Sequence, residues 1–242
     1  MNFFSLLSLP NLLTLLNLLA GCLGIVFVFS YRLEWVPYCV LISLVADYLD
    51  GFAARFTKNA TDIGKQLDSL ADVVSFGVLP GAIMFHLLFQ NYESGSGSLP
   101  EATIYLLCIP AFLITLFAAL RLAKFNTDHR QSDSFLGLPT PAVAIFITGF
   151  LLTFLHNSFG LSFYLFQLPV LYGVVIVLSI LMVIELPMFA LKFKSFSWKG
   201  NETAFSFLLL SLVLLATLKF AAISLIVILY LIISLIQKQI KP

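Results

Sequence analysis

Residues 47–72 decide the fold, and they read DYLDGFAARFTKNATDIGKQLDSLAD. Positions 47, 50, 51, 54 and 55 have the spacing of one stripe along an α-helix, and positions 64, 68 and 72 share one face of a second helix. The polar residues 57–62 between them predict a turn, so the two helices form an antiparallel hairpin. All four aspartates of the stretch that lie on these faces can then converge near one end of the pair: Asp47, Asp50, Asp68 and Asp72.

The second and third apolar runs contain all four aspartates, although a charge at mid-membrane costs about 2.5–3.5 kcal/mol. Like charges this close cannot all stay ionised without compensation, and Arg55 supplies only one positive charge. Two divalent cations would balance the four carboxylates, and oxygen ligands suit Mg²⁺ or Mn²⁺. The cluster contains neither His nor Cys, which argues against zinc. Pairs of such ions serve phosphoryl chemistry.

Other interpretations of the aspartates stay open at this point. They could be solvated residues or helix caps at a membrane edge, as we expect for Asp62 in the turn. They could also mark a cation pathway, since carboxylates inside membranes occur in transporters. A transporter leaves the small residues of the stripe unexplained. Gly51, Ala54 and Gly64 keep this face free of bulk, so that a ligand can approach the backbone closely.

The composition identifies the class of protein. Of the 242 residues, 60% are hydrophobic and 10% are charged, whereas a soluble domain carries about 25% charged residues. We therefore predict an all-α integral membrane protein in which residues 1–242 form a single membrane domain. The 13 basic residues nearly balance the 12 acidic ones, so nucleic acid is not expected as a partner.

Apolar runs of spanning length follow one another along the chain. The last run, residues 203–236, would be about 50 Å long as one helix against a hydrocarbon core of about 30 Å, so we predict two helices that turn near Lys219. The total is about eight membrane helices, preceded by a short interfacial helix in the first ten residues. The six earlier runs are 11–30, 35–56, 63–90, 100–125, 141–158 and 167–190.

Loop charges give the orientation. With the N-terminus and the loop after the second span in the cytoplasm, every Lys and Arg except Arg32 and Lys219 lies inside, as the positive-inside rule requires. A seven-span arrangement would place Lys238 and Lys241 outside. The acidic cluster then faces the cytoplasm. Glu185, near the end of the sixth run, is expected to pair with Lys192 or Lys194.

The spacing D-x2-D-G-x2-A-R-x8-G-x3-D-x3-D is similar to the signature of the CDP-alcohol phosphatidyltransferases at every fixed position. The resemblance covers residues 8–190 as a six-helix core and leaves a C-terminal helical hairpin, residues 203–237, outside it. It implies that the four aspartates hold two divalent cations and that Asp72 is also the general base. It further implies a CDP-binding site formed by Asp50, Gly51, Ala54, Arg55 and Gly64.

Three flanking segments resemble the branch of this family whose acceptor is L-serine: DVVSFGVLP at 72–80, RLAKFN at 121–126 and FLGLPTPA at 135–142. That branch usually has Arg in place of Lys124 and Ala in place of Gly81. The resemblance implies attack of the serine hydroxyl on CDP-diacylglycerol, giving phosphatidylserine and CMP. The expected acceptor-binding residues are Ser75, Arg121, Lys124, Asn126 and Arg130.

Sibling enzymes that use glycerol 3-phosphate or inositol phosphate are the alternative, although such acceptors demand a denser cluster of cations. The resemblance also implies a homodimer. We expect a bacterial cytoplasmic (inner) membrane as the location. Because one substrate is soluble and the other is a membrane lipid, the active site should open both to the cytoplasm and sideways to lipid.

Overall fold

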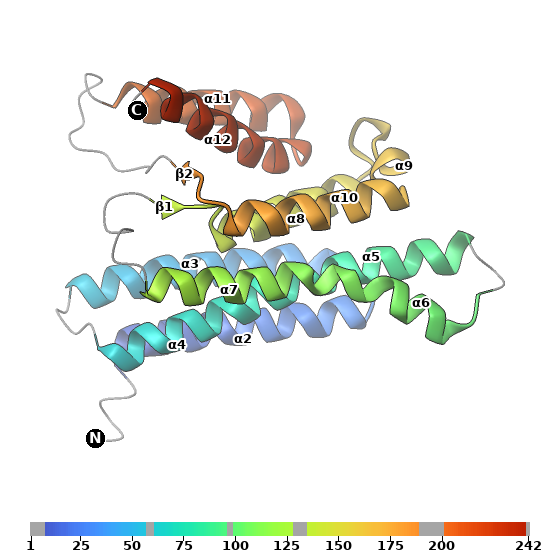
Figure 1. Ribbon diagram of the computed structural model, residues 1–242, viewed down its shortest axis with the longest axis horizontal. Coiled ribbons are helices and arrows are strands. Elements are labelled where there is room, and N and C mark those ends of the chain that lie inside the picture. The colour runs from blue at the N-terminus through green and yellow to red at the C-terminus, as the bar shows by residue number, and fades with distance from the viewer. Residues whose placement is uncertain (1–7, 57–60, 96–98, 128–134, 189–200, 241–242) are drawn as a thin grey trace.

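The computed structural model describes residues 8–56, 61–95, 99–127, 135–188 and 201–240. The expected interfacial helix at the N-terminus lies outside these residues. Almost all described elements are helical (Figure 1). The helices are α2 (Leu9–Phe29), η1 (Leu33–Trp35), α3 (Val36–Phe56), α4 (Asp62–Asp72), η2 (Val73–Val78), α5 (Leu79–Gly95), α6 (Glu101–Cys108), η3 (Ile109–Phe112), α7 (Leu113–Thr127), α8 (Thr140–Leu155), η5 (Ser158–Gly160), α9 (Ser162–Leu165), α10 (Leu168–Val183), α11 (Glu202–Leu218) and α12 (Ala221–Ile240).

Within the described residues, four continuous helical stretches are long and apolar enough to cross a membrane: 9–29, 33–56, 62–95 and 101–127. The apolar helices α8, α10, α11 and the 221–237 part of α12 are shorter. Many large hydrophobic side chains on the outer faces are exposed, for example Leu19 at 55% and Leu106 at 67%. In a helical bundle such faces require lipid to cover them. The chain is therefore an all-α membrane protein.

The helices lie roughly side by side, and α2, α3, α4–α5 and α6–α7 form one group (Figure 1). α2 packs against α3, α4, η2 and α5, while α8 packs against α3, α5 and α12. α10 packs against α5 and α7. Helix α5 is largely buried, and its residues Leu79, Ile83, Met84, Leu87 and Leu88 are almost fully buried. The core therefore sits between α5 and the helices that surround it.

The third long helix contains a π-helical segment, η2, directly after Asp72. Such segments carry a wider turn and often occur at functional sites. Glycine lets α2 come close to it: a Cβ built on Gly21 would lie 2.9 Å from the backbone Cα of Ser75. This close approach brings the polar side chains of α2 next to the end of α4.

The sixth predicted span, 167–190, is too long. Helix α10 ends at Val183, and Ile184 has the extended φ and ψ values −63° and 145°. The chain then forms an antiparallel pair between β2 (Pro187–Met188) and β1 (Phe135–Leu136), which the sequence analysis did not anticipate. Gly137 permits this pairing because its φ is +78°, and its N–H donates to the carbonyl of Leu186 at 2.8 Å. The fifth span also ends earlier than expected, at Leu155.

The last apolar run breaks at Lys219, whose φ is +50°, into α11 and α12. We call this pair the C-terminal hairpin. It packs on the rest of the molecule through α8: Ser224 Oγ donates to the carbonyl of Phe146 at 2.8 Å. A Cβ on Gly149 would lie 2.6 Å from the backbone nitrogen of Ser224, so this contact is too close for a larger residue.

Candidate active site

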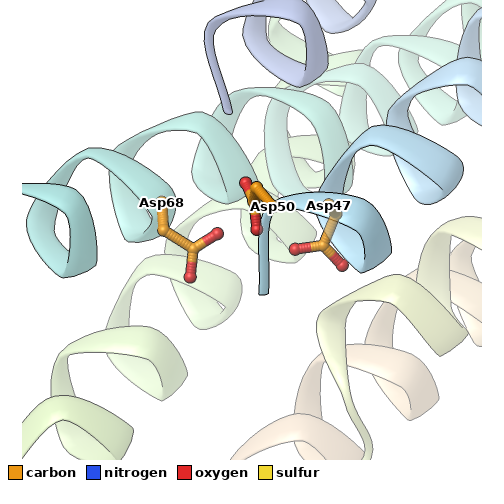
Figure 2. A group of neighbouring side chains, drawn as sticks. All are labelled: Asp47, Asp50 and Asp68. Carbon is orange, nitrogen blue, oxygen red and sulfur yellow. The ribbon is translucent and has the colours of Figure 1, made fainter. Parts of the chain in front are cut away.

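An acidic cluster forms where α3 and α4 face each other. One carboxylate oxygen each from Asp47, Asp50 and Asp68 lies within 4.8 Å of the others, and Figure 2 shows the three side chains around a common space. Asp72 follows one turn after Asp68 and is only 8% exposed. Asp47, Asp68 and Asp72 line one cavity of about 820 Å³, which we call the central cavity. Helical spacing on two antiparallel helices is sufficient to produce this arrangement.

The donor set of the cluster fits a divalent cation. All its ligand atoms are carboxylate oxygens, the type that Mg²⁺ and Mn²⁺ prefer. Asp68 Oδ1 is buried and has no hydrogen-bond partner among the residues that the structure describes. A buried oxygen of this kind is costly unless a ligand satisfies it. The cluster could therefore hold metal.

Helix α2 supplies two side chains that hold the aspartates, and the sequence analysis missed both. Thr14 Oγ1 donates to Asp50 Oδ2 at 2.6 Å, and Asn17 Nδ2 donates to Asp72 Oδ1 at 3.1 Å. Asn17 is itself fixed, because its carbonyl accepts from Ser43 Oγ and Ser75 Oγ. The signal was present in the sequence: polar residues recur every third position at 11, 14 and 17 in an otherwise apolar helix.

Replacing Thr14 by valine is expected to weaken Mn²⁺ binding by roughly 10-fold to 100-fold, the usual effect of losing a side chain that orients a metal ligand. Valine keeps the shape of threonine but cannot donate to Asp50. Titration calorimetry with Mn²⁺ measures the effect. The matched control is Thr153→Val, because Thr153 is buried on α8 and donates to the carbonyl of Gly149. Equal Mn²⁺ affinity in the Thr14 and Thr153 variants would show that Thr14 does not support the site.

Other elements complete the walls of the central cavity. One side comes from the start of α8, where Pro139, Thr140, Pro141 and Ala142 line it. α7 contributes a buried arginine and an asparagine, and the C-terminal hairpin contributes mainly apolar side chains. The further lining residues are Tyr48, Gly51, Arg55, Lys65, Ser69, Arg121, Leu122, Phe125, Asn126, Ile145, Phe207, Ile226, Val227 and Tyr230. A cavity of this size and mixed polarity is typical of small-molecule sites.

Only some of the residues predicted to bind CDP line the central cavity. Gly51 and Arg55 line the central cavity, and a Cβ on Gly51 would meet only Arg55 Nη1, at 3.8 Å. Asp50 and Ala54 are not among its lining residues. Gly64 is also absent from the lining: a Cβ there would lie 3.0 Å from Asn11 Oδ1. The structure therefore gives Gly64 a packing reason to be small.

Two of the residues predicted to bind the acceptor line the central cavity: Arg121 and Asn126, whose Nδ2 donates to Ser69 Oγ at 2.7 Å. Ser75 is fully buried against α2 and is not part of the lining. Lys124 is not part of the lining either. Arg130 lies outside the described residues.

Lys124 Nζ forms an ion pair with Glu185 Oε1 at 2.8 Å. The expectation that Glu185 would use Lys192 or Lys194 did not foresee this partner, and both of those lysines lie outside the described residues. The cause is the early end of α10: the chain that follows pairs with β1, close to the end of α7. Such a half-exposed pair contributes about 0–1 kcal/mol to stability.

Comparison with known proteins identifies the family to which this chain belongs. The family described as CDP-alcohol phosphatidyltransferase matches residues 7–184, which include α2 to α10 and the whole acidic cluster. The chain belongs to the CDP-alcohol phosphatidyltransferase family.

Individual relatives carry more specific names. A CDP-diacylglycerol–serine O-phosphatidyltransferase of Helicobacter pylori strain J99 is 34% identical over 236 residues, covering 94% of this chain and 90% of the relative. A protein of the same name from Methanocaldococcus jannaschii is 37% identical over 60% of each chain. An archaetidylserine synthase of Methanothermobacter thermautotrophicus is 34% identical over 69% of this chain and 67% of its own length.

Proposed function

We propose that this chain transfers the phosphatidyl group of CDP-diacylglycerol to the hydroxyl of L-serine, giving phosphatidylserine and CMP. The observation that carries the proposal is the acidic cluster, of which Asp47, Asp68 and Asp72 line the central cavity. The relative from Helicobacter pylori, whose name states this reaction, matches along nearly the whole chain and supports the choice of serine.

In this proposal Asp47, Asp50, Asp68 and Asp72 hold two divalent cations, Mg²⁺ or Mn²⁺. When bound, such ions neutralise a diphosphate and stabilise the attacking and leaving oxygens. Thr14 and Asn17 hold Asp50 and Asp72 in place for this task. The open backbone at Gly51 leaves room for the nucleotide beside Arg55. Asp50, Ala54 and Gly64 complete the proposed CDP-binding stripe.

Asp72 takes the proton from the serine hydroxyl. Asn17 donates to Asp72 Oδ1 and so fixes the carboxylate, which serves both as a metal ligand and as the base. The hydroxyl oxygen then forms a bond to the phosphorus that carries the diacylglycerol. The bond from this phosphorus to the bridging oxygen of the diphosphate breaks, and CMP leaves with the electron pair. Positioning and charge neutralisation provide most of the acceleration in such transfers.

The proposed acceptor site lies on the α7 side of the central cavity. Of the residues inferred from sequence, Arg121 and Asn126 line the cavity, which supports their role in binding the acceptor. Ser75 supports the site through its bond to Asn17, and Lys124 through its pair with Glu185. Arg130 keeps the role inferred from sequence.

For the topology we propose eight spans in a bacterial inner membrane, with residues 8–190 as the catalytic core and residues 203–237 as a hairpin. At about 1.5 Å per residue, the 16 residues of α8 or α10 cover most of a hydrocarbon core of about 30 Å. The acidic cluster faces the cytoplasm, where the basic loops lie. The chain acts as a homodimer, as the family resemblance implies.

The assay that tests the function measures CMP release by the purified full-length chain from CDP-diacylglycerol, with Mn²⁺ or Mg²⁺ and one acceptor at a time. We expect release with L-serine. Turnover with glycerol 3-phosphate or inositol phosphate but not with serine would overturn the acceptor while keeping the class. If no acceptor yields CMP and the chain instead moves cations across liposome membranes, it is a transporter.

A further inference from the structure

The C-terminal hairpin forms part of the wall of the central cavity. The family match ends at residue 184, yet Phe207 of α11 and Tyr230 of α12 both line the cavity. The two rings pack edge to face with centroids 6.1 Å apart and an interplanar angle of 62°. The hairpin is anchored on α8 through Ser224. The Tyr230 side chain therefore has a defined place at the substrate site.

Besides Asp68, two further lining residues of this cavity have a buried polar atom without a hydrogen-bond partner among the described residues. Arg121 is 7% exposed, and its Nε has no hydrogen-bond partner among the described residues. Thr140 is fully buried, and its Oγ1 is equally unsatisfied within the described part of the chain. Native proteins rarely leave such groups unpaired, because the cost of burial is not recovered. The residues that carry these atoms, Arg121 and Thr140, both line the central cavity, so a polar ligand bound there lies beside them.

The charges around this wall favour an anion. Arg121 lines the central cavity together with Asp72 and Tyr230. Thr140 is the first residue of α8, a helix of 16 residues whose beginning lines the cavity. A helix N-terminus carries roughly half a positive charge and has backbone N–H groups without helical partners. A guanidinium and a helix terminus thus face one space beside Asp72.

We propose that Arg121, Thr140 and Tyr230 form a subsite for the carboxylate of the acceptor amino acid. This inference rests on the proposed function and names how the acceptor is recognised. Arginine binds carboxylates with paired N–H donors, and the two hydroxyls can donate to the same anion. Arg121 and Asp72 line the same cavity, so an acceptor held by Arg121 can place its hydroxyl near the base.

The same chemistry could bind a phosphate oxygen of the lipid substrate. The carboxylate is the better fit, because a phosphate demands more positive charge than one guanidinium and two hydroxyls provide. The diphosphate is also expected beside the acidic cluster and its cations. The KM values for L-serine and for CDP-diacylglycerol distinguish a bound carboxylate from a bound phosphate.

The test uses Tyr230→Phe and Thr140→Val in the full-length chain, each of which removes one hydroxyl and keeps the shape of the residue. We expect the KM for L-serine to rise about tenfold in each variant, as a hydrogen bond to a charged group is lost. The KM for CDP-diacylglycerol should stay unchanged. The preference for serine over serinol, in which CH₂OH replaces the carboxylate, should fall by the same factor.

Matched controls are Tyr164→Phe, since Tyr164 is 65% exposed on α9 and is not in the cavity lining, and Thr153→Val on α8. A rise in the KM for CDP-diacylglycerol instead of serine would assign the subsite to phosphate and overturn the proposal. If the variants lose activity equally with serine and with serinol, Tyr230 and Thr140 contribute only packing and do not bind the carboxylate. If the unmodified chain uses serine and serinol equally well, the proposed subsite is also wrong. If it releases no CMP with any acceptor, the proposed function itself is contradicted.

Discussion

Replacing Asp72 by asparagine is expected to lower CMP release from CDP-diacylglycerol and serine by about a thousandfold or more. Loss of a general base alone costs about 10²–10⁴ in rate, and this variant also loses a proposed metal ligand. Asparagine has nearly the same shape, and its amide oxygen can still accept from Asn17. The loss therefore follows from chemistry and not from collapse of a buried position. Initial rates with saturating Mn²⁺ and both substrates measure it.

The control for Asp72→Asn is Asp62→Asn. Asp62 lies in the first turn of the same helix, is exposed, and is not in the lining of the central cavity. The two variants lose the same charge, so an effect confined to Asp72 depends on its place in the site. A rate near that of the unmodified chain in Asp72→Asn would exclude this residue as the base.

Removal of divalent cations with EDTA is expected to abolish CMP release, and Mn²⁺ should restore it. With carboxylate oxygens within 4.8 Å, each pair of negative charges repels by roughly 3–4 kcal/mol at an effective dielectric constant of about 20. A bound divalent cation would relieve this repulsion. Activity that survives complete chelation would mean that the cluster works without metal and would overturn the proposed ligand set.

Thermal unfolding gives a readout of metal binding that does not depend on activity. Mn²⁺ at a hundredfold excess over its dissociation constant should stabilise the folded chain by about 2.7 kcal/mol per site, because it binds the native state alone. The increase in stability should disappear in Asp68→Asn, which loses a buried carboxylate without a hydrogen-bond partner for Oδ1 among the described residues, and should persist in Asp62→Asn. Calorimetry should find two Mn²⁺ ions per chain, and a single ion would contradict the proposed pair.

The spacing of residues 47–72 was enough to predict a good part of the site. Helical periodicity is a local property, so positions 47 and 50 share a face whatever the rest of the chain does. A short polar turn between two apolar helices leaves little freedom, and the carboxylates of Asp47, Asp50 and Asp68 do meet. Hydrophobicity likewise identified the membrane class and the break near Lys219, because lipid limits how long one helix can be.

The partners of these residues depend on packing between segments far apart in the chain. Thr14 and Asn17 reach the aspartates because glycine brings α2 close to η2. Tyr230 reaches the cavity because α12 lies on α8. Lys124 forms an ion pair with Glu185 because α10 ends early and β2 then pairs with β1. The sequence by itself determined which faces are acidic and which segments need lipid, since both follow from neighbours along the chain. Only the tertiary structure decided which distant helices close the cavity, because those contacts arise from the fit of many side chains at once.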